Sequence, residues 1–137
     1  MLAVCQLTQD LEQLPFGLDT QIGEKGVNIS GGQRARISLA RACYADCDIY
    51  LLDDPLSAVD SHVARNLFFN CIRGFLREKT VILATHQFSF LPHSDKVVQL
   101  EAGYIKFNLK VEDCNQFMNI SYESEKITDI TKVVIDS

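Results

Sequence analysis

Several features are absent from this sequence of 137 residues, and each absence argues against a class of protein. No apolar run approaches the length of a membrane-spanning helix, so no such helix is predicted. The first residues have no basic stretch and soon reach Asp10 and Glu12, a pattern that predicts no secretory signal peptide. The net charge is −5 and the basic residues form no long run, which argues against non-specific nucleic-acid binding as the main task.

The cysteines lack a metal-binding pattern. There are five of them, and none forms a C-x-x-C pair. Cys43 and Cys47 are separated by three residues, but no second pair or histidine cluster completes a zinc set. An odd, scattered set of cysteines (Cys5, Cys43, Cys47, Cys71 and Cys114) is typical of reduced, mostly buried thiols in the cytosol.

A phosphate-cradling G-x-x-x-x-G-K-[ST] loop is also missing, because none of the seven glycines precedes a lysine. The composition that remains, 47% hydrophobic and 23% charged, is ordinary for a globular chain of one domain with a core.

The most informative stretch is a glycine turn followed by a helical pattern from about Gly32 to Tyr44, with Ile37, Ala40 and Tyr44 on one face. Two glycines let the backbone approach a ligand, and the N-terminus of a helix favours an anion such as phosphate. The alternative is a plain loop in which Ser30 only caps the helix.

A strand, a helix and a second strand follow. Residues 48–55 and 80–85 contain apolar runs typical of strands buried on both faces of a parallel sheet. Between them, Ser61 is expected to cap a helix with an apolar stripe formed by Val63, Leu67, Cys71 and Phe75. This order predicts a βαβ unit, in which ligands gather at the carboxyl ends of the strands.

The remaining segments have simpler patterns. The expected elements are a helix over 1–14 ended by Pro15 and Gly17, a helical turn over 88–91 ended by Pro92, a hairpin of 96–100 with 104–107, a helix over 111–118, and a polar tail over 119–137 in which Ile127, Ile130 and Val134 favour a weak amphipathic helix.

Polar residues follow both predicted strands. Asp53 and Asp54 end the first, and His86 follows the second. An acidic pair at such a place is suited to a magnesium–nucleotide, since the first carboxylate can bind the hydrated metal and the second can orient a water. Paired acids also occur as ordinary turn residues, and a lone histidine is more often a surface or capping residue.

The order and spacing of four motifs resemble the nucleotide-binding domain of ATP-binding cassette transporters. These motifs are Ile29-Ser30-Gly31-Gly32-Gln33, Leu51-Leu52-Asp53-Asp54-Pro55, Ser57-Ala58-Val59-Asp60 and Thr85-His86. The amino-acid sequences of residues 48–60 and of residues 19–26 are most similar to those of subfamily C, the multidrug resistance-associated proteins. Ile29 departs mildly from the leucine that usually opens the first motif.

The resemblance implies a role for each motif. It assigns ATP contacts to the signature loop (Ser30 to Gln33) and the D-loop (Ala58 to Asp60), magnesium binding to the Walker B aspartate Asp53, and catalysis to Asp54 and the switch histidine His86. The residues implied to contact ATP are Ser30, Gly31, Gly32, Gln33 and Asp60. It also implies an α/β fold, with a parallel P-loop NTPase sheet and part of a helical subdomain.

The same resemblance divides the chain. Residues 1–118 correspond to the C-terminal part of a cassette, with the helical subdomain over 1–44 and the core over 45–118. Residues 119–137 are expected to form a weakly ordered linker or tail. The P-loop would precede Met1, so the chain alone is expected to lack ATPase activity.

Asp54 stands where most cassettes have glutamate, which suggests the first, weakly hydrolysing cassette of a pair. Because aspartate is one methylene shorter, its carboxylate retreats by about 1 Å, and such a misplacement can cost roughly 10²-fold in rate. The signature loop is then expected to act in trans, on ATP held by a second cassette packed head-to-tail.

Three functions are compatible with these patterns. The first is part of an exporter of organic anions or drugs, at the cytoplasmic face of a membrane, with transmembrane domains and a second cassette as partners. The second is a P-loop-less module that pairs with an intact cassette. The third, a DNA-repair or chromosome-structure ATPase, is disfavoured because heptad coiled coils are missing and the net charge is acidic.

Overall fold

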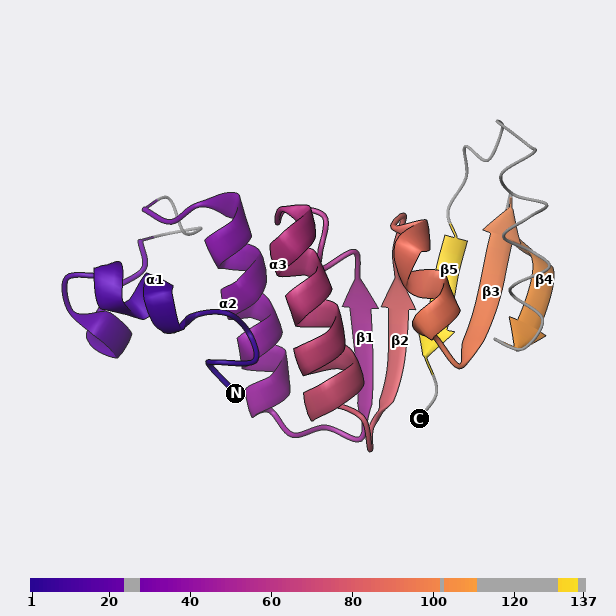
Figure 1. Cartoon of the computed structure of the whole chain (residues 1–137), viewed down its shortest axis with the longest axis horizontal. Coiled ribbons are helices and arrows are strands. Elements are labelled where there is room, and N and C mark those ends of the chain that lie inside the picture. The colour runs from indigo at the N-terminus through magenta and orange to yellow at the C-terminus, as the bar shows by residue number, and fades with distance from the viewer. Residues whose placement is uncertain (24–27, 102, 111–130, 136–137) are drawn as a thin grey trace. The chain divides into compact units, whose positions relative to one another are not determined.

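The computed structural model describes residues 1–23, 28–101, 103–110 and 131–135 (Figure 1). Helices and strands are both present, and the first two strands pair in parallel, so the predicted α/β class is confirmed. Among the described residues, no helix combines the length and apolar character that crossing a bilayer requires.

The chain divides into two compact units. The helical unit consists of residues 1–47 and 55–78, and the sheet unit consists of residues 48–54 and 79–137. Within the described residues, all five strands belong to the sheet unit. The domain boundaries expected from the resemblance, at residues 44 and 118, stay a prediction.

The N-terminal helix is shorter than predicted. Turns precede α1 (Thr8–Gln13), and the 3₁₀ helix η1 (Gly17–Asp19) follows it. Gln6 adopts a left-handed conformation with φ of 56°, which a continuous right-handed helix cannot accommodate. As predicted, α1 ends just before Pro15.

The helix α2 (Gly31–Tyr44) belongs to the helical unit, and its limits agree with the prediction. The residues expected on one face differ in burial, because Ala40 is buried whereas Tyr44 is 80% exposed. The buried residues of α2 are Leu39, Ala40 and Cys43.

The next helix changes its winding midway. The α-helix α3 (Ser61–Asn66) continues directly into the π-helical segment η3 (Leu67–Phe75). Here the N–H of Leu76 donates to the carbonyl of Cys71, 2.9 Å away and five residues earlier. The buried side chains of η3 are Leu67, Phe68, Cys71 and Ile72. A π-helix has more residues per turn than an α-helix, so side chains at α-helical spacing no longer share one face. Phe75, the last member of the predicted stripe, is accordingly 48% exposed.

The sheet unit contains one five-stranded sheet in the order β1-β2-β5-β3-β4 (Figure 1). Its strands are β1 (Ile49–Asp53), β2 (Thr80–Ala84), β3 (Lys96–Glu101), β4 (Tyr104–Lys110) and β5 (Thr131–Ile135). β1 and β2 are parallel, as predicted, and Asp53 pairs in register with Ala84. The remaining neighbours are antiparallel, so the sheet is mixed.

One face of β1 differs from the prediction. Tyr50 and Leu52 are buried, but Ile49 is 59% exposed and Leu51 is 75% exposed. Successive strand residues point to opposite faces, so the two exposed side chains lie on one side of the sheet. The prediction of two buried faces is therefore wrong for β1, because its apolar side chains are buried on one face and exposed on the other.

The predicted hairpin of β3 and β4 is confirmed, with Gly103 at its turn in a left-handed conformation, φ 83°. The predicted turn before it forms the 3₁₀ helix η4 (Phe88–His93), which includes Pro92 instead of ending at it.

At the C-terminus, residues 131–135 form β5 between β2 and β3, where the sequence predicted a tail with weak helical character. The β-branched run of Thr131, Val133, Val134 and Ile135 favours a strand, which explains the difference. The helix predicted over 111–118 and the tail over 119–130 lie outside the described residues.

Candidate functional site

The glycine turn is fixed by a reciprocal cap at the start of α2. The Ser30 hydroxyl oxygen accepts from the Gln33 N–H at 3.1 Å, and the Ser30 N–H donates to Gln33 Oε1 at 2.8 Å. Such a capping box satisfies two groups that a helix end otherwise leaves open. The Ser30 hydroxyl proton and the first-turn N–H groups remain suited to an anion, which the positive end of the helix dipole favours.

The two glycines have different surroundings. A Cβ atom on Gly32 would stand 3.2 Å from the carbonyl oxygen of Ala58 and 3.5 Å from Val59 Cγ1. At Gly31 the nearest atom would be 3.9 Å away, at the mobile end of the Arg34 side chain. A side chain at Gly32 would therefore crowd the contact between the first turn of α2 and the loop at Ala58 and Val59, whereas Gly31 leaves open space of the kind that a bound phosphate needs.

A partly buried hydrogen-bond network holds the Gln33 side chain. Gln33 Nε2 donates to Asp10 Oδ1 at 3.0 Å, and Arg36 contacts Asp10 Oδ2 at 2.7 Å. The Asp10 and Arg36 side chains are only 16% and 14% exposed, so water weakens this pair less than a surface pair. Sequence reasoning missed Asp10, because nothing in the local pattern around it shows a partner 26 residues away.

Asp60 caps the next helix. Its Oδ1 accepts from the N–H groups of His62 and Val63, both at 3.0 Å, and these bonds lower the pKa of the Asp60 carboxyl, with Val63 contributing most. The expected cap, Ser61, is instead the first residue of α3, so that prediction is wrong by one position. A carboxylate is a better acceptor for two N–H groups than a hydroxyl.

The acidic pair lies where β1 leaves the sheet. Asp53 is exposed, while Asp54 is half-buried and has one carboxylate oxygen, Oδ1, inside the protein. Asp54 adopts a left-handed φ of 44°, and its N–H donates to the carbonyl of Ala84 at 2.8 Å. Non-glycine residues in this conformation are strained and cluster at functional sites.

His86 follows the neighbouring strand. Thr85 is buried, and its hydroxyl oxygen accepts from the Gln87 N–H at 3.1 Å, whereas His86 itself is exposed. Because Asp53 and Ala84 are in register on parallel strands, the acidic pair and His86 emerge at the same edge of the sheet. This edge can offer a carboxylate oxygen to a hydrated Mg²⁺ and an imidazole to a phosphate.

The predicted site residues thus fall into two groups. Those of the signature loop and Asp60 belong to the helical unit, and Asp53, Asp54 and His86 belong to the sheet unit. Each group fits part of a magnesium–nucleotide: the first offers N–H and hydroxyl donors for phosphate oxygens, and the second offers carboxylates for the metal. Their assigned functions stay predictions.

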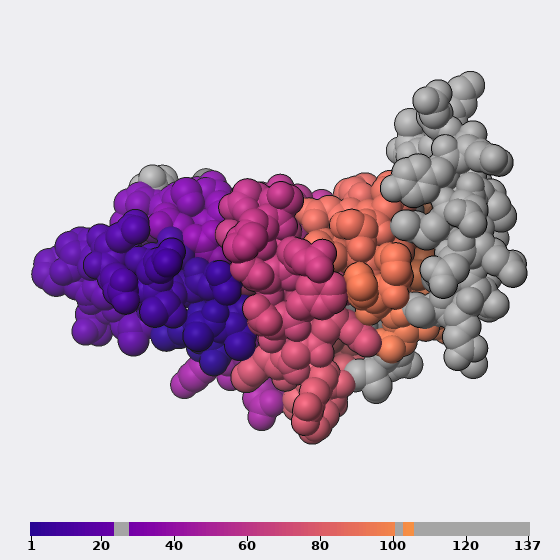
Figure 2. All heavy atoms as spheres, viewed as in Figure 1, coloured from indigo at the N-terminus to yellow at the C-terminus, as the bar shows by residue number. Residues whose placement is uncertain are grey.

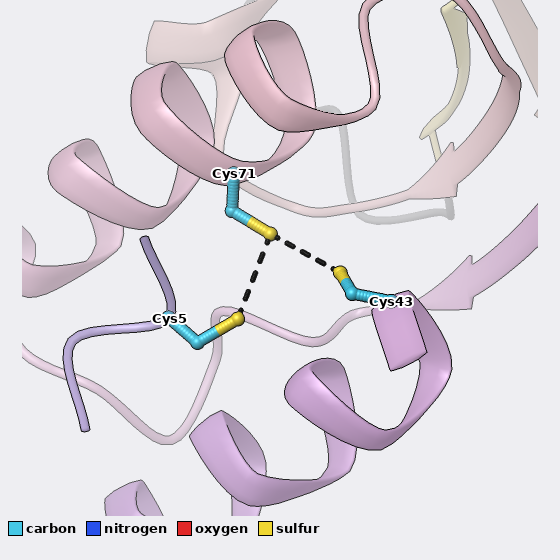
Figure 3. Close-up of side chains that lie close together, drawn as sticks. All are labelled: Cys5, Cys43 and Cys71. Carbon is cyan, nitrogen blue, oxygen red and sulfur yellow. Dashed lines mark hydrogen bonds between the residues drawn. The ribbon is translucent and has the colours of Figure 1, made fainter. Parts of the chain in front are cut away.

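A second cluster, of three buried thiols, was not anticipated from the sequence. Cys43 Sγ is 3.5 Å and Cys5 Sγ is 3.8 Å from Cys71 Sγ (Figure 3). The Cys5 and Cys71 thiols lower the pKa of Cys43 to about 4, and the Cys43 thiolate raises the pKa of Cys5 to about 11 and raises that of Cys71 also. The expected burial is confirmed for these three, whereas Cys47 is exposed.

Comparison with known proteins gives a consistent result. Residues 3–57 match the ABC transporter family. The chain is 53% identical over 105 residues to ABC transporter C family member 12 of Dictyostelium discoideum, which covers 77% of this chain. It is 58% identical over 106 residues, 76% of this chain, to ATP-binding cassette sub-family C member 3 of Homo sapiens.

A plant relative covers more of the chain. ABC transporter C family member 7 of Arabidopsis thaliana is 48% identical over 124 residues, 88% of this chain. The matched segments amount to only 7% to 8% of the length of these relatives.

Proposed function

Because this chain belongs to the ABC transporter family, we propose that it forms part of the ATP-binding cassette of a subfamily C exporter. The complete exporter would couple ATP binding and hydrolysis to the movement of organic anions or drugs across a membrane. The observation that carries the proposal is the turn at residues 30–33, which joins a reciprocal cap to an exposed, unobstructed Gly31 at a helix N-terminus.

In this proposal the turn acts on ATP that a second cassette holds, in a head-to-tail pair. The Ser30 hydroxyl proton and the N–H groups of Gly31 and Gly32 would donate to the γ-phosphate. The Ser30 oxygen is already an acceptor for the Gln33 N–H, so its proton is directed away from the cap. Gln33 and Asp60 act mainly by positioning the two loops, since both side chains are engaged within the protein.

The sheet edge would serve the chain's own nucleotide site. Asp53 would bind Mg²⁺ through an exposed carboxylate, Asp54 would orient the attacking water, and His86 would contact the γ-phosphate. The short, partly buried Asp54 side chain makes hydrolysis at this site slow, so the site would mainly bind ATP.

The partners in this proposal are a second cassette and the transmembrane domains of the exporter, which would place the cassette at the cytoplasmic face of a membrane. The alternative is a module without catalysis of its own that pairs with an intact cassette. Both proposals predict the same pairing, because both depend on the signature turn.

Pairing can be tested directly. The chain would be mixed with an intact second cassette of a subfamily C exporter and ATP, and the complex measured by light scattering after size exclusion. We expect ATP-dependent pairing that is lost in Gly31→Asp, because a carboxylate in the open space would repel phosphate. Aspartate in the first turn suits the helix dipole, so the variant should still fold.

The matched control is Ser38→Asp, which adds the same charge to an exposed position of α2. We expect this variant to pair as the wild type does. Pairing that survives Gly31→Asp, or that does not depend on ATP, would contradict the signature function.

A further inference from the structure

The Cys5–Cys43–Cys71 cluster joins three segments of the helical unit that are far apart in sequence. Cys5 lies in the N-terminal turns, Cys43 in the last turn of α2 and Cys71 in η3, and the three side chains point toward one another (Figure 3). The three are between 0% and 4% exposed, and their sulfur atoms lie within 4.8 Å of one another. No part of the proposed nucleotide chemistry uses them.

The spacing of the sulfur atoms matches a three-coordinate metal site. Three sulfurs at about 2.3 Å from a central ion in a trigonal arrangement are separated by about 4.0 Å. The two shortest separations here are 3.5 Å and 3.8 Å, so an ion could be bound with side-chain shifts of a few tenths of an ångström, on the order of ordinary rotamer adjustment. Cysteines that act only as small apolar core residues have no need to converge in this way.

The type of ligand selects the type of ion. Thiolates favour soft ions, whereas Mg²⁺ and Ca²⁺ require oxygen ligands. Structural zinc takes four protein ligands, and among the described residues the cluster contains these three cysteines and no histidine or carboxylate. Copper(I) is soft and accepts thiolate ligands, which leaves it as the ion best matched to the cluster.

We propose that Cys5, Cys43 and Cys71 form a three-coordinate thiolate site for a soft metal ion, with copper(I) as its preferred occupant. All three cysteines would coordinate as thiolates: Cys43 already is one, Cys5 and Cys71 would each release one proton to solvent, and no oxidant or reductant is consumed. The site is independent of the proposed nucleotide function.

Binding would fasten the N-terminal segment to the helices. In the space-filling view the N-terminal residues, in indigo, lie directly against the α3–η3 segment, in rose (Figure 2). A metal bound to Cys5 and Cys71 adds a link between segments that are 66 residues apart. Because the thiols are buried, the ion would enter during folding or when the N-terminal turns open.

The test is a copper(I) titration of the full chain, without oxygen, against a competing bicinchoninate chelator. The starting protein is C47S/C114S, which retains only the three clustered cysteines. We expect it to bind one copper(I) per chain and to unfold at a higher temperature when loaded. Adding Cys71→Ala should weaken binding by at least about 100-fold, because losing even an outer-sphere partner costs roughly 10- to 100-fold.

Two further measurements keep the test decisive if Cys71→Ala does not fold. Cys5→Ala removes a ligand from the N-terminal turns and leaves both helices intact, and it should weaken binding similarly. X-ray absorption of the copper-loaded C47S/C114S chain should give three sulfur neighbours. Fewer sulfurs, no bound copper, or unchanged affinity in a folded alanine variant would overturn the proposal.

Discussion

Gly32, in the first turn of α2, lies so close to Ala58 that a Cβ atom on Gly32 would stand 3.2 Å from the Ala58 carbonyl oxygen. We expect Gly32→Ala to lower the free energy of unfolding by about 1 kcal/mol, because the crowded carbonyl must move. Gly31→Ala is the matched control, since its nearest atom would be 3.9 Å away and alanine favours the helix. Urea denaturation measures both, and equal effects would contradict the packing argument.

Asp10 is far from the signature loop in sequence but is expected to stabilise it through its hydrogen bond to Gln33. Removing its carboxylate in Asp10→Ala leaves Arg36 partly buried without its ion pair and frees the Gln33 amide. We expect a loss of about 2 kcal/mol in the free energy of unfolding, since hydrogen bonds to charged groups contribute roughly 1.5–3 kcal/mol. ATP-dependent pairing with a second cassette should weaken as well.

The control for Asp10 is Glu12→Ala, which removes an exposed carboxylate from the same helix α1. It should change stability by no more than about 0.5 kcal/mol. If both variants lose the same stability, the Asp10 network contributes nothing specific.

The cap at Asp60 should make the start of α3 sensitive to acid. The pKa of Asp60 is lowered in the folded chain by the N–H groups of Val63 and His62, so the capped carboxylate stabilises the fold above the unfolded-state pKa. This contribution is lost as pH falls through the lower, folded-state pKa. Carboxyl chemical shifts measured by NMR against pH should give a midpoint for Asp60 below 3.8.

Asp60→Asn is the informative variant, because asparagine retains the capping oxygen but does not titrate. We expect nearly normal stability at neutral pH and a smaller decrease in thermal stability on acidification. An unchanged acid response in Asp60→Asn would assign that response to other carboxylates.

The exposed face of β1 should make the isolated chain prone to association. Leu51 is 75% exposed and belongs to β1, which is an edge strand of the sheet, so we expect the chain to self-associate and to be marginally stable. Leu51→Ser should reduce association, measured by light scattering, with little effect on the unfolding midpoint. Its neighbour Leu52 is 9% exposed, and Leu52→Ser should destabilise the fold. A monodisperse wild-type chain with a sharp, reversible thermal transition would contradict this expectation.

Catalysis provides a separate prediction. The chain has no G-x-x-x-x-G-K-[ST] loop to hold the phosphates of its own nucleotide, so we expect no ATP turnover by the isolated chain. Phosphate release measured with and without His86→Ala tests this. Steady turnover that His86→Ala abolishes would show that the chain binds and hydrolyses ATP unaided.

Elements with strong local signals could be predicted from the sequence. The helix at Gly31–Tyr44 begins with a serine cap and a helical pattern, the run at Ile49–Asp53 is mostly apolar, and the run at Thr80–Ala84 is apolar and rich in β-branched residues. The parallel pairing of these two strands follows from the helical segment between them. The residues of the acidic pair could be placed at the strand end for the same reason.

Other features depend on distant contacts that no local pattern contains. The Asp10–Arg36 pair and the thiol cluster join residues far apart in sequence, and only the tertiary fold brings them together. The exposure of Leu51 could not be predicted either, because the same apolar run occurs in strands with one covered face and in strands with two. The wrong choice of Ser61 over Asp60 reflects two adjacent residues that both cap helices well.

The capping box at Ser30 and Gln33 has a kinetic consequence. Its two hydrogen bonds already hold the turn in the folded chain, so the conformational entropy of ordering it is lost during folding and not during ligand capture. The turn therefore already has the geometry that would bind a phosphate. The apparent dissociation constant for phosphate would not be raised by the need to populate a rare conformer first. The rate of capture would then be set by how often the two cassettes meet in the correct orientation, because the turn itself has no slow rearrangement to make.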